Sequence, residues 1–511
     1  MHCLYWLETE EFSCELIMEN LKHYQMYIDG KWTDAEDGKT FESLNPATGK
    51  AWAIIPEANE ADVNRAVVAA HDAFTTGPWR TMLPVERGRL LRKLAQGLQD
   101  HAEELGRVET TDTGKLFKET KFLANYVAEY CYYFAGLADK LEGATLPIDK
   151  PDMFTMTVRE PLGVVAAIVP WNSQLFLSVL KIAPALAAGN TVVIKASEHA
   201  SAAMLEFGKV VDGIGFPPGV INMVTGFGDP CGKTLSSHPL VDRISFTGGL
   251  ESARQIVRNS AENFAQVSLE LGGKSPMLIF EDADIESAVN GILISIFSAS
   301  GQSCVAGSRL FIAESIFDDL IERVRQRASE IVIGDPFDEA SEMGPLATMA
   351  QLQRIKQSVA DAVEQGATLV HGGKTPENRE QGWYIEPTIL VCPDQNLDIV
   401  KTEMFGPVVT AFKFADEKQA IAMANETDFG LASGIFTADV GRAMRVSRAI
   451  RAGIVWINTY RVVSPVAPFG GYKNSGYGRE GGIDAVYDYT RVKTIWINTS
   501  EKPIADPFRM Q

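Results

Sequence analysis

The spacing of apolar residues changes along the chain, and the change divides it into regions. Residues 27–55 alternate between apolar and polar side chains in short segments separated by Asp-Gly and Thr-Gly pairs, which predicts short strands joined by turns. Apolar residues then recur at helical spacing, which predicts a helix over residues 59–74 and a largely helical region over residues 84–141. The first part of the chain is therefore expected to be mainly helical after a few short strands.

From residue 162 onward, continuous apolar runs alternate with helical patterns. The runs predict strands at residues 164–169, 191–195, 220–224, 244–246 and 266–271. The intervening patterns predict helices near residues 178–188 and 201–214 and from residue 250. Strands without alternation are buried on both faces, so the expected fold class is α/β with a doubly wound parallel sheet. Such a sheet binds ligands outside the carboxyl ends of its strands.

A second α/β region is predicted from residue 274 to about residue 471, with strands near 309–312 and 453–457 and helices near 315–332 and 350–365. Two further segments, 154–158 and 489–497, alternate as strands but stand apart from both regions. An exposed strand invites pairing, and a second subunit is one partner that would cover it. A chain of 511 residues also exceeds a single core, so two or three domains are expected.

Composition narrows the partners and the location. The net charge of -19 makes nucleic acid and anionic membranes poor partners, and no apolar run is long and unbroken enough to span a membrane. The six cysteines are scattered without a CxxC pair, which argues against a disulfide framework or a metal cluster and favours a reducing, cytoplasmic location. Residues 1–25 lack the features of a secretion signal and are interpreted as a possible leader, with Met18 as an alternative start.

Cys304 is the first candidate for chemistry. Apolar residues from Ile285 to Ile296 form the stripe of a buried helix, and Gly301 is expected to end it. A cysteine three residues later lies on backbone free to offer its own N–H beside the sulfur, which suits a nucleophile with a built-in oxyanion donor. On this stretch alone, a cysteine that serves as a small buried apolar side chain is the alternative.

Two polar residues would complement such a nucleophile. Glu270 ends a strand beside two glycines, where low polarity would raise its pKa toward that of a useful base; a carboxylate exposed at the sheet edge is the alternative. Asn172 follows the first strand of the sheet, where its amide suits an oxyanion hole or simply a turn. No histidine lies within about 60 residues of Cys304 in the sequence, which disfavours a cysteine hydrolase.

Motifs at other strand ends suit a dinucleotide. Glu198 follows Lys195 at the end of the second strand, where a carboxylate can bind a ribose diol. The segment Phe246-Thr247-Gly248-Gly249 ends the fourth strand and opens a helix, where a pyrophosphate can approach backbone amides. The segment Gly226-Phe227-Gly228 is similar to a nucleotide-binding glycine pattern but is too short to identify one.

Together, seven motifs resemble the aldehyde dehydrogenase superfamily, and they occur in family order between about residue 26 and residue 498. The motifs are Pro170-Trp171-Asn172, Ile194-Lys195-x-x-Glu198, Phe246-Thr247-Gly248, Leu269-Glu270-Leu271-Gly272-Gly273-Lys274, Gly301-Gln302-x-Cys304, Glu403-x-Phe405-Gly406-Pro407 and Pro468-Phe469-Gly470-Gly471-x-Lys473-x-Ser475-Gly476. The resemblance implies oxidation of an aldehyde to an acid with NAD, or with NADP as a second possibility. It also implies a three-part subunit that forms homodimers or homotetramers.

The resemblance further implies the domain boundaries. Residues 26–142 and 162–273 would form the dinucleotide-binding domain, and residues 274–471 the catalytic domain. Residues 143–161 and 487–499 would form a small oligomerisation ribbon, which would account for the two isolated strand segments.

Each motif residue acquires an implied role. Cys304 would be the nucleophile, Glu270 the base that activates water, and Asn172 an oxyanion donor together with the Cys304 N–H. Lys181 and Glu480 would form a proton relay. The residues implied for cofactor binding are Pro170, Trp171, Lys195, Glu198, Gly228, Phe246, Thr247, Gly248, Gly249, Leu271, Glu403 and Phe405. Gly249 departs from the pattern, because a serine is usual there and its hydroxyl contact to the pyrophosphate is missing.

The resemblance also implies an aldehyde tunnel. Its lining residues would be Ser173, Leu177, Leu180, Ser303, Val305, Arg461, Val463 and Phe469. Most of these are apolar, which favours a medium-length aliphatic or a simple aromatic aldehyde, although Arg461 could pair with a distal carboxylate. Two alternatives stay open: a CoA-acylating dehydrogenase, which would not need Glu270 as a base, and a protein that kept the fold without catalysis.

Overall fold

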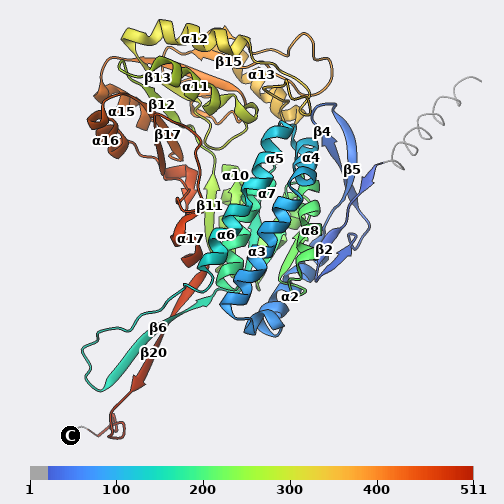
Figure 1. The fold of residues 1–511 in the computed structure, drawn as a ribbon, viewed down its shortest axis with the longest axis vertical. Coiled ribbons are helices and arrows are strands. Elements are labelled where there is room, and N and C mark those ends of the chain that lie inside the picture. Colours follow the sequence, from blue (N-terminus) through green and yellow to red (C-terminus); the bar gives the residue numbers. More distant parts are fainter. Residues whose placement is uncertain (1–20, 510–511) are drawn as a thin grey trace, which may run out of the picture.

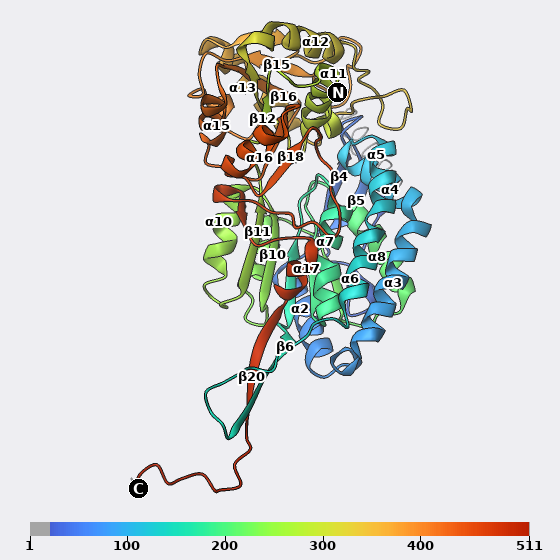
Figure 2. The ribbon, with the colours of Figure 1, turned by 60° about the vertical axis from the view of Figure 1, so that its left-hand side comes forward.

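The computed structural model describes residues 21–509, which form two α/β bodies and a two-stranded arm that projects from one of them (Figure 1). The lower body contains a large sheet covered by helices, and the upper body contains a second sheet (Figure 2). None of the helices described is long and apolar enough to cross a membrane.

The sheet of the lower body has eight strands and confirms the predicted doubly wound arrangement. Its order is β19 (Gly476–Tyr477), β11 (Gln266–Leu271), β10 (Arg243–Gly248), β7 (Val164–Ile168), β8 (Thr191–Lys195), β9 (Ile221–Val224), β2 (Met26–Ile28) and β3 (Lys31–Thr33). The five strands from β7 to β11 are parallel to one another. The chain moves outward from β7 in one direction through β8 and β9 and then returns to place β10 on its other side. Ligands of such sheets bind at this point of reversal.

The continuous apolar pattern of these strands has a direct cause in the packing. Along β7, Val165 and Ala167 belong to a core that α7 (Gln174–Ala188) and α8 (Ala202–Ile214) cover. Val164 and Ala166 belong to the core on the opposite face, under α2 (Glu60–Thr75) and α10 (Leu250–Asn259). Neither face of the strand meets water, so both sets of positions are apolar.

The predicted helical region of residues 84–141 forms an outer layer on the α7 and α8 side. It consists of α3 (Pro84–Asp100), α4 (Ala102–Thr113), α5 (Phe117–Tyr126) and α6 (Ala128–Leu137). A small sheet of β1 (Lys22–His23), β5 (Lys50–Pro56) and β4 (Thr40–Asn45) lies beside it. Because β1 pairs with β5, the fold begins before the predicted boundary at residue 26. Residues 1–20 of the predicted leader, which include Met18, lie outside the described residues.

The upper body is built on a seven-stranded sheet. Its order is β14 (Thr368–His371), β15 (Thr388–Val391), β16 (Val408–Phe414), β13 (Arg309–Ala313), β12 (Pro276–Ile279), β17 (Ala432–Phe436) and β18 (Ile454–Ile457). One face packs against α11 (Ile285–Ile296) and α12 (Phe317–Ser329). The other face packs against α13 (Met349–Glu364), α14 (Asp398–Lys401), α15 (Glu417–Asn425) and α16 (Val440–Ala449).

The helix before Cys304 ends earlier than predicted. α11 stops at Ile296 rather than at Gly301, and a 3-10 turn over Ser298–Gly301 follows it. The cause is in the backbone, because Ala299 and Ser300 take the left-handed conformation with φ of 53° and 54°. Two such residues cannot continue a right-handed helix. The segment from this turn to Cys304 is irregular.

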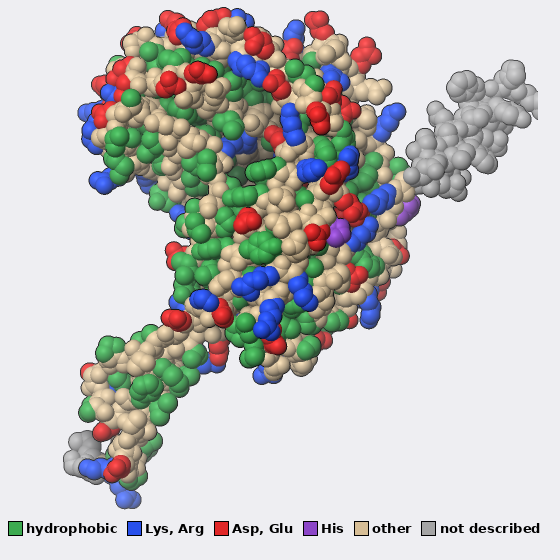
Figure 3. Space-filling model, viewed as in Figure 1, with side chains coloured by type: hydrophobic (Ala, Val, Ile, Leu, Met, Phe, Trp, Pro, Cys, Tyr) green, Lys and Arg blue, Asp and Glu red, His purple; other side chains and the backbone are tan. Residues whose placement is uncertain are grey.

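The two isolated strand segments pair with each other rather than standing alone. β6 (Met153–Pro161) and β20 (Thr490–Asn498) form the antiparallel arm, and β20 follows the short helix α17 (Gly482–Tyr487). Hydrophobic side chains cover much of the visible side of the arm (Figure 3). Phe154 of β6 is 42% exposed and Trp496 of β20 is 58% exposed, so apolar surface remains uncovered in a single chain.

A core substitution tests the packing of α7. Leu186 is fully buried in the core between α7 and the sheet, so Leu186→Ala should lower the free energy of unfolding by about 2–5 kcal/mol. Leu83 is 59% exposed, and Leu83→Ala should change it by no more than about 0.5 kcal/mol. Urea denaturation followed by circular dichroism measures both. Equal effects of the two substitutions would contradict the packing described.

Candidate active site

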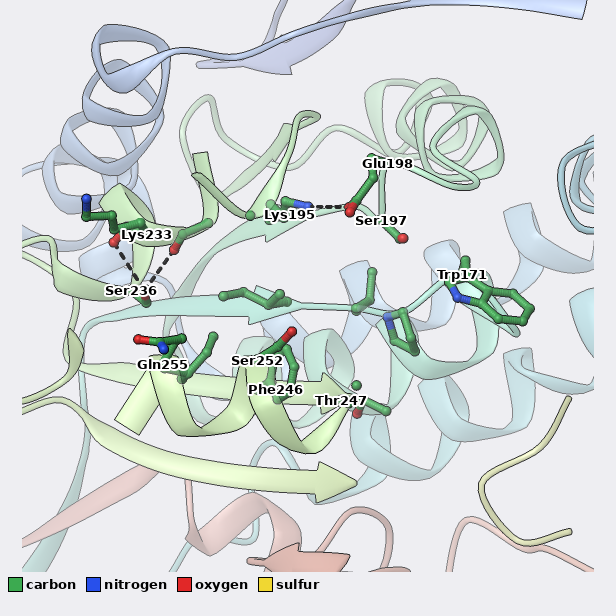
Figure 4. A pocket seen from close by; sticks show the side chains of 18 of the residues that line it. Trp171, Lys195, Ser197, Glu198, Lys233, Ser236, Phe246, Thr247, Ser252 and Gln255 are labelled. Carbon is green, nitrogen blue, oxygen red and sulfur yellow. Dashed lines mark hydrogen bonds and ion pairs between the residues drawn. The ribbon is translucent and has the colours of Figure 1, made fainter. Parts of the chain in front are cut away.

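A cavity of about 590 Å³ opens at the carboxyl ends of β7, β8 and β10, where the strand order reverses (Figure 4). Nine of the residues predicted to bind a cofactor line it: Pro170, Trp171, Lys195, Glu198, Gly228, Phe246, Thr247, Gly248 and Gly249. The strands therefore bring together motifs that lie up to about 80 residues apart in the sequence.

Lys195 and Glu198 form an ion pair on one wall of this cavity, with 3.2 Å between Nζ and Oε2 (Figure 4). Burial alone would raise the pKa of Glu198, but the Lys195 ammonium outweighs burial and holds that pKa below its ordinary value. Glu198 therefore stays a carboxylate, which can accept hydrogen bonds from a ribose diol. This wall fits the adenosine half of NAD.

Gly249 lies on the opposite wall as the residue before α10. No heavy atom lies within 4 Å of the position that a Cβ at Gly249 would take, and no side chain caps the helix. The first N–H groups of α10 are therefore open to the cavity, as a pyrophosphate requires. The serine that is usual at this position would fit, so its absence removes a hydroxyl and not a steric obstacle.

Several cavity residues were not predicted from the motifs. Ser252, Gln255 and Asn259 of α10 face the cavity, as do Lys233 and Ser236 of α9 (Lys233–Ser237). The three α10 residues follow helical spacing and form the polar side of this amphipathic helix. That periodicity was a usable signal once the helix was placed at the strand end.

Three predicted cofactor residues lie outside the lining of this cavity. Leu271 is buried at the carboxyl end of β11. The Glu403 carboxylate accepts a hydrogen bond from the Gly273 N–H at 3.0 Å. Phe405 packs edge-on against Trp171, with 5.4 Å between the ring centroids, so it adjoins the cavity through that lining residue.

The backbone on both sides of Cys304 is held by hydrogen bonds, at Gln302 before it and at Val305 after it. The Asn172 Nδ2 donates to the Gln302 carbonyl at 3.1 Å, and the Tyr460 hydroxyl donates to the Val305 carbonyl at 2.9 Å. Cys304 is partly exposed, whereas the other free cysteines among residues 21–509 are buried. The first of these contacts brings the Asn172 amide to the cysteine loop, as the oxyanion prediction requires.

The thiol of Cys304 is not activated in this arrangement. Burial, followed by the negative charges of Glu403 and Glu270, raises its pKa to about 12, and the Arg461 guanidinium opposes the rise. The thiol is therefore protonated at neutral pH. Loss of charge at either carboxyl group, or a cation near the sulfur, would lower this pKa.

Glu270 is almost fully buried, and neither of its carboxyl oxygens has a hydrogen-bond partner among the described residues. Burial, and then the negative charge of Glu480, raise its pKa well above the ordinary value, while Lys181 opposes the rise. This excludes the alternative of a carboxylate exposed at the sheet edge. A carboxylate whose pKa is raised is a stronger base than an exposed one.

Lys181 and Glu480 form a buried ion pair next to Glu270. The Lys181 ammonium also donates to the Thr247 hydroxyl at 2.6 Å, and Thr247 lines the cofactor cavity. Lys181 thus links Glu480 to the wall of the cofactor cavity. The predicted relay residues are therefore adjacent, although far apart in sequence.

Comparisons with known proteins agree with this geometry. The model of the aldehyde dehydrogenase family matches residues 32–495. The chain is 55% identical over 493 residues to the (Z)-2-((N-methylformamido)methylene)-5-hydroxybutyrolactone dehydrogenase of Acinetobacter baylyi, which covers 96% of this chain and 100% of that protein. The chain belongs to the aldehyde dehydrogenase family.

Solved structures of this family have the same fold. Betaine aldehyde dehydrogenase from Staphylococcus aureus, solved in complex with NAD+, has a TM-score of 0.93 at 38% identity and covers 96% of this chain and 97% of its own. PnpE from a Pseudomonas species has a TM-score of 0.92 at 42% identity and covers 95% and 99%. The predicted family, reaction class and cofactor are confirmed: the protein is an NAD-dependent aldehyde dehydrogenase.

The predicted tunnel residues of the dehydrogenase come from several elements, and some of them lie next to Cys304. Ser303 and Val305 flank the cysteine, Ser173 directly precedes α7, which carries Leu177 and Leu180, and Phe469 packs into the apolar cluster that contains Cys304. The Val463 carbonyl accepts a hydrogen bond from the Tyr126 hydroxyl at 2.9 Å. Their joint role as a tunnel stays a prediction.

Arg461 has surroundings that the sequence did not suggest. Its Nη1 donates to the carbonyls of Ile294 at 3.2 Å and Ser298 at 3.1 Å, and its charge interacts with Cys304 and with Glu119. Glu119 accepts from the Ala299 N–H at 3.1 Å, and its Oε2 is buried without a partner among residues 21–509. Glu119 lies about 185 residues from Cys304 in the sequence, so no local pattern could have revealed it.

The thiol pKa gives a test of the site electrostatics. In the dehydrogenase, Glu403→Gln removes a negative charge near Cys304 and should lower its pKa, so alkylation by iodoacetamide at pH 8 should accelerate about three- to tenfold. Mass spectrometry of the Cys304 peptide over a pH series measures the rate. Glu377 is 93% exposed, and Glu377→Gln should have no effect. Alkylation of Glu403→Gln at the wild-type rate would show that this charge does not reach the sulfur.

Proposed function

We propose that Cys304 is the nucleophile of the dehydrogenase and that Glu270 is the base that activates the hydrolytic water. The observation that carries this proposal is the buried Glu270 carboxyl group, which has no hydrogen-bond partner among the described residues and lies close enough to Cys304 to raise its pKa. A buried carboxyl group without a partner is costly to the fold, so its retention points to a role in catalysis.

The proposed reaction begins when the Cys304 thiolate adds to the aldehyde carbon. The Asn172 Nδ2 has a second N–H besides the one bonded to Gln302, and it donates to the new oxyanion together with the Cys304 N–H. NAD, when bound, supplies the hydride acceptor that converts the thiohemiacetal into a thioester. Glu270 then takes a proton from water, which attacks the thioester and releases the acid.

Glu480 and Lys181 are proposed to carry that proton away from Glu270. Their ion pair lies beside Glu270 and ends at Thr247 on the wall of the cofactor cavity. The charge of Glu480 also helps to keep the pKa of Glu270 high. This arrangement supports a relay from the site of hydrolysis toward the cavity.

The cofactor side is proposed to favour NAD over NADP. The ionised Glu198 accepts from a ribose hydroxyl, whereas a phosphate at that position would meet a negative charge. Residues 26–142 and 162–273 are proposed as the dinucleotide-binding domain and residues 274–471 as the catalytic domain. Glu403, Phe405 and Leu271 are proposed to hold the nicotinamide end of NAD, since they lie between these two regions.

The arm, within residues 143–161 and 487–499, is proposed to join subunits into a homodimer or homotetramer. Its exposed Phe154 and Trp496 support this, because apolar surface of that kind is covered in a stable assembly. A cytoplasmic location is proposed from the free cysteines of the described chain, none of which is paired in a disulfide. Glu270 in place as a base disfavours the CoA-acylating alternative.

A substitution of Glu270 should separate thioester formation from thioester hydrolysis. Glu270→Gln should release about one equivalent of NADH per site in a burst and then turn over very slowly, because the thioester forms but hydrolysis lacks its base. Absorbance at 340 nm in a stopped-flow instrument measures both phases. Cys304→Ala is the control and should show neither phase. Wild-type steady-state turnover by Glu270→Gln would refute the assignment of the base.

The substrate is proposed to be an aldehyde that carries a carboxyl group. The Acinetobacter relative is named for a 5-hydroxybutyrolactone, and such a ring is the closed form of a four-carbon chain with an aldehyde at one end and a carboxyl group at the other. Arg461 supports a similar substrate here, because its cation lies near Cys304 and only Nη1 is engaged with backbone carbonyls. This proposal departs from the uncharged aldehyde that the apolar lining favours.

A series of substrates distinguishes an aldehyde that carries a carboxyl group from an uncharged aldehyde. Succinate semialdehyde should exceed butanal, hexanal and benzaldehyde in kcat/KM, and Arg461→Met should reduce that advantage about 10- to 100-fold while the values for butanal stay within about threefold. Arg323 is 58% exposed, and Arg323→Met is the control. If hexanal or benzaldehyde is the best substrate of the wild type, the uncharged aldehyde is the right class.

A further inference from the structure

We propose that Lys115 is a positioning residue that holds the oxyanion donor Asn172 in place. Lys115 is 4% exposed, and its ammonium donates to the Asn172 carbonyl at 3.1 Å and to the Ser173 hydroxyl at 2.9 Å. It therefore fixes the backbone of the residue whose side chain is proposed to bind the oxyanion. The inference rests on the proposed role of Asn172.

A buried ammonium group needs compensation, and α4 supplies part of it. Glu109, two turns earlier along the chain, attracts the Lys115 charge, and Glu119 does so from α5. Burial lowers the pKa of Lys115, these two carboxylates oppose the fall, and Arg461 adds to it. The lysine thus lies among charged groups that include those of the predicted tunnel. Lys115 is therefore not a lysine that merely anchors backbone at the protein surface.

The same end of α4 also holds the start of α8. The Asp112 carboxylate accepts from the N–H groups of Ala202 at 2.8 Å and Ala203 at 3.3 Å, directly after the segment with Lys195 and Glu198. Lys115 acts in the same way on the segment before α7. One short stretch of chain therefore fixes both the oxyanion loop and the cofactor loop, although it belongs to neither.

The contacts from Lys115 continue to Cys304. The Asn172 Nδ2 donates to the Gln302 carbonyl, and the Gln302 Oε1 accepts from the Ala347 N–H at 2.8 Å. These link Lys115 to the loop that carries the nucleophile and to the segment that supports it from behind.

This chain of contacts returns to Gly114, the residue before Lys115. The Ser300 hydroxyl donates to the Gly344 carbonyl at 2.8 Å, and a Cβ at Gly344 would lie 2.2 Å from the Gly114 carbonyl oxygen. A Cβ at Gly114, whose φ is +75°, would in turn lie 2.6 Å from the Pro345 side chain. Backbone segments packed this closely cannot move independently of one another, so a displacement of Lys115 also displaces Asn172.

The consequence is that the loss of the Lys115 ammonium should act on catalysis through Asn172. A residue that matters only for folding would lower activity independently of Asn172. A double-mutant cycle separates these two cases, because effects that pass through one donor are not additive.

The assay is the hydrolysis of p-nitrophenyl acetate without cofactor, since attack of Cys304 on this ester also forms an oxyanion. Asn172→Ala should lower kcat about 100- to 1,000-fold, as the loss of one oxyanion donor does elsewhere. Lys115→Met should lower kcat about tenfold with KM changed by less than about threefold. The double variant should match Asn172→Ala within about twofold. Lys121→Met, at a lysine that is 48% exposed, is the matched control and should equal the wild type.

The outcomes separate the inference from the function on which it rests. Wild-type kcat in Lys115→Met, or a double variant lower than Asn172→Ala by the full Lys115→Met factor, overturns the positioning role. Wild-type kcat in Asn172→Ala refutes the proposed oxyanion donor instead. The dissociation constant for NAD, measured by calorimetry, should be unchanged in Lys115→Met and reports that it is folded. If that variant does not fold, Lys115→Gln runs through the same cycle under the same criteria.

Discussion

The active site depends on one constraint, which is that its charged groups are buried and must each find a partner or lose their charge. Lys181 and Glu480 satisfy each other, and Lys115 is satisfied by a carbonyl and a hydroxyl. Glu270 is the member left without a partner among the described residues, so its pKa rises. The groups that have partners hold the loops around Cys304 in place. The Glu270 carboxyl group, which has none, is available for proton transfer.

The same constraint keeps the resting site unreactive. The pKa of the Cys304 thiol is raised, first by burial and then by the nearby Glu403 and Glu270, so the sulfur is held as a thiol. A protonated thiol resists oxidation and chance alkylation better than a thiolate does. The protein can thus keep a potentially strong nucleophile in a partly exposed position without exposing it to side reactions.

The sequence revealed the parts of this structure that repeat or that lie at strand ends. The buried strands of the parallel sheet, the position of Lys195 and Glu198 at a strand end and the glycines before α10 were readable because local pattern and position agree. The early end of α11 was missed, because the left-handed backbone of Ala299 and Ser300 is imposed by surrounding contacts and not by residue type. Lys115 and Glu119 were missed because their contacts are with segments distant in the sequence.

The arm has a consequence for how the chain is made. Its second strand, β20, begins at Thr490, about 330 residues after β6 ends at Pro161, so on a ribosome that adds roughly 5–20 residues per second β6 waits roughly 20–60 s for its partner. During that time the edge of β6 that later pairs with β20 is uncovered. Glu480 also emerges late, so a nascent chain holds Cys304 and Glu270 long before Lys181 has its partner. This buried ion pair is therefore completed only by the last part of the polypeptide.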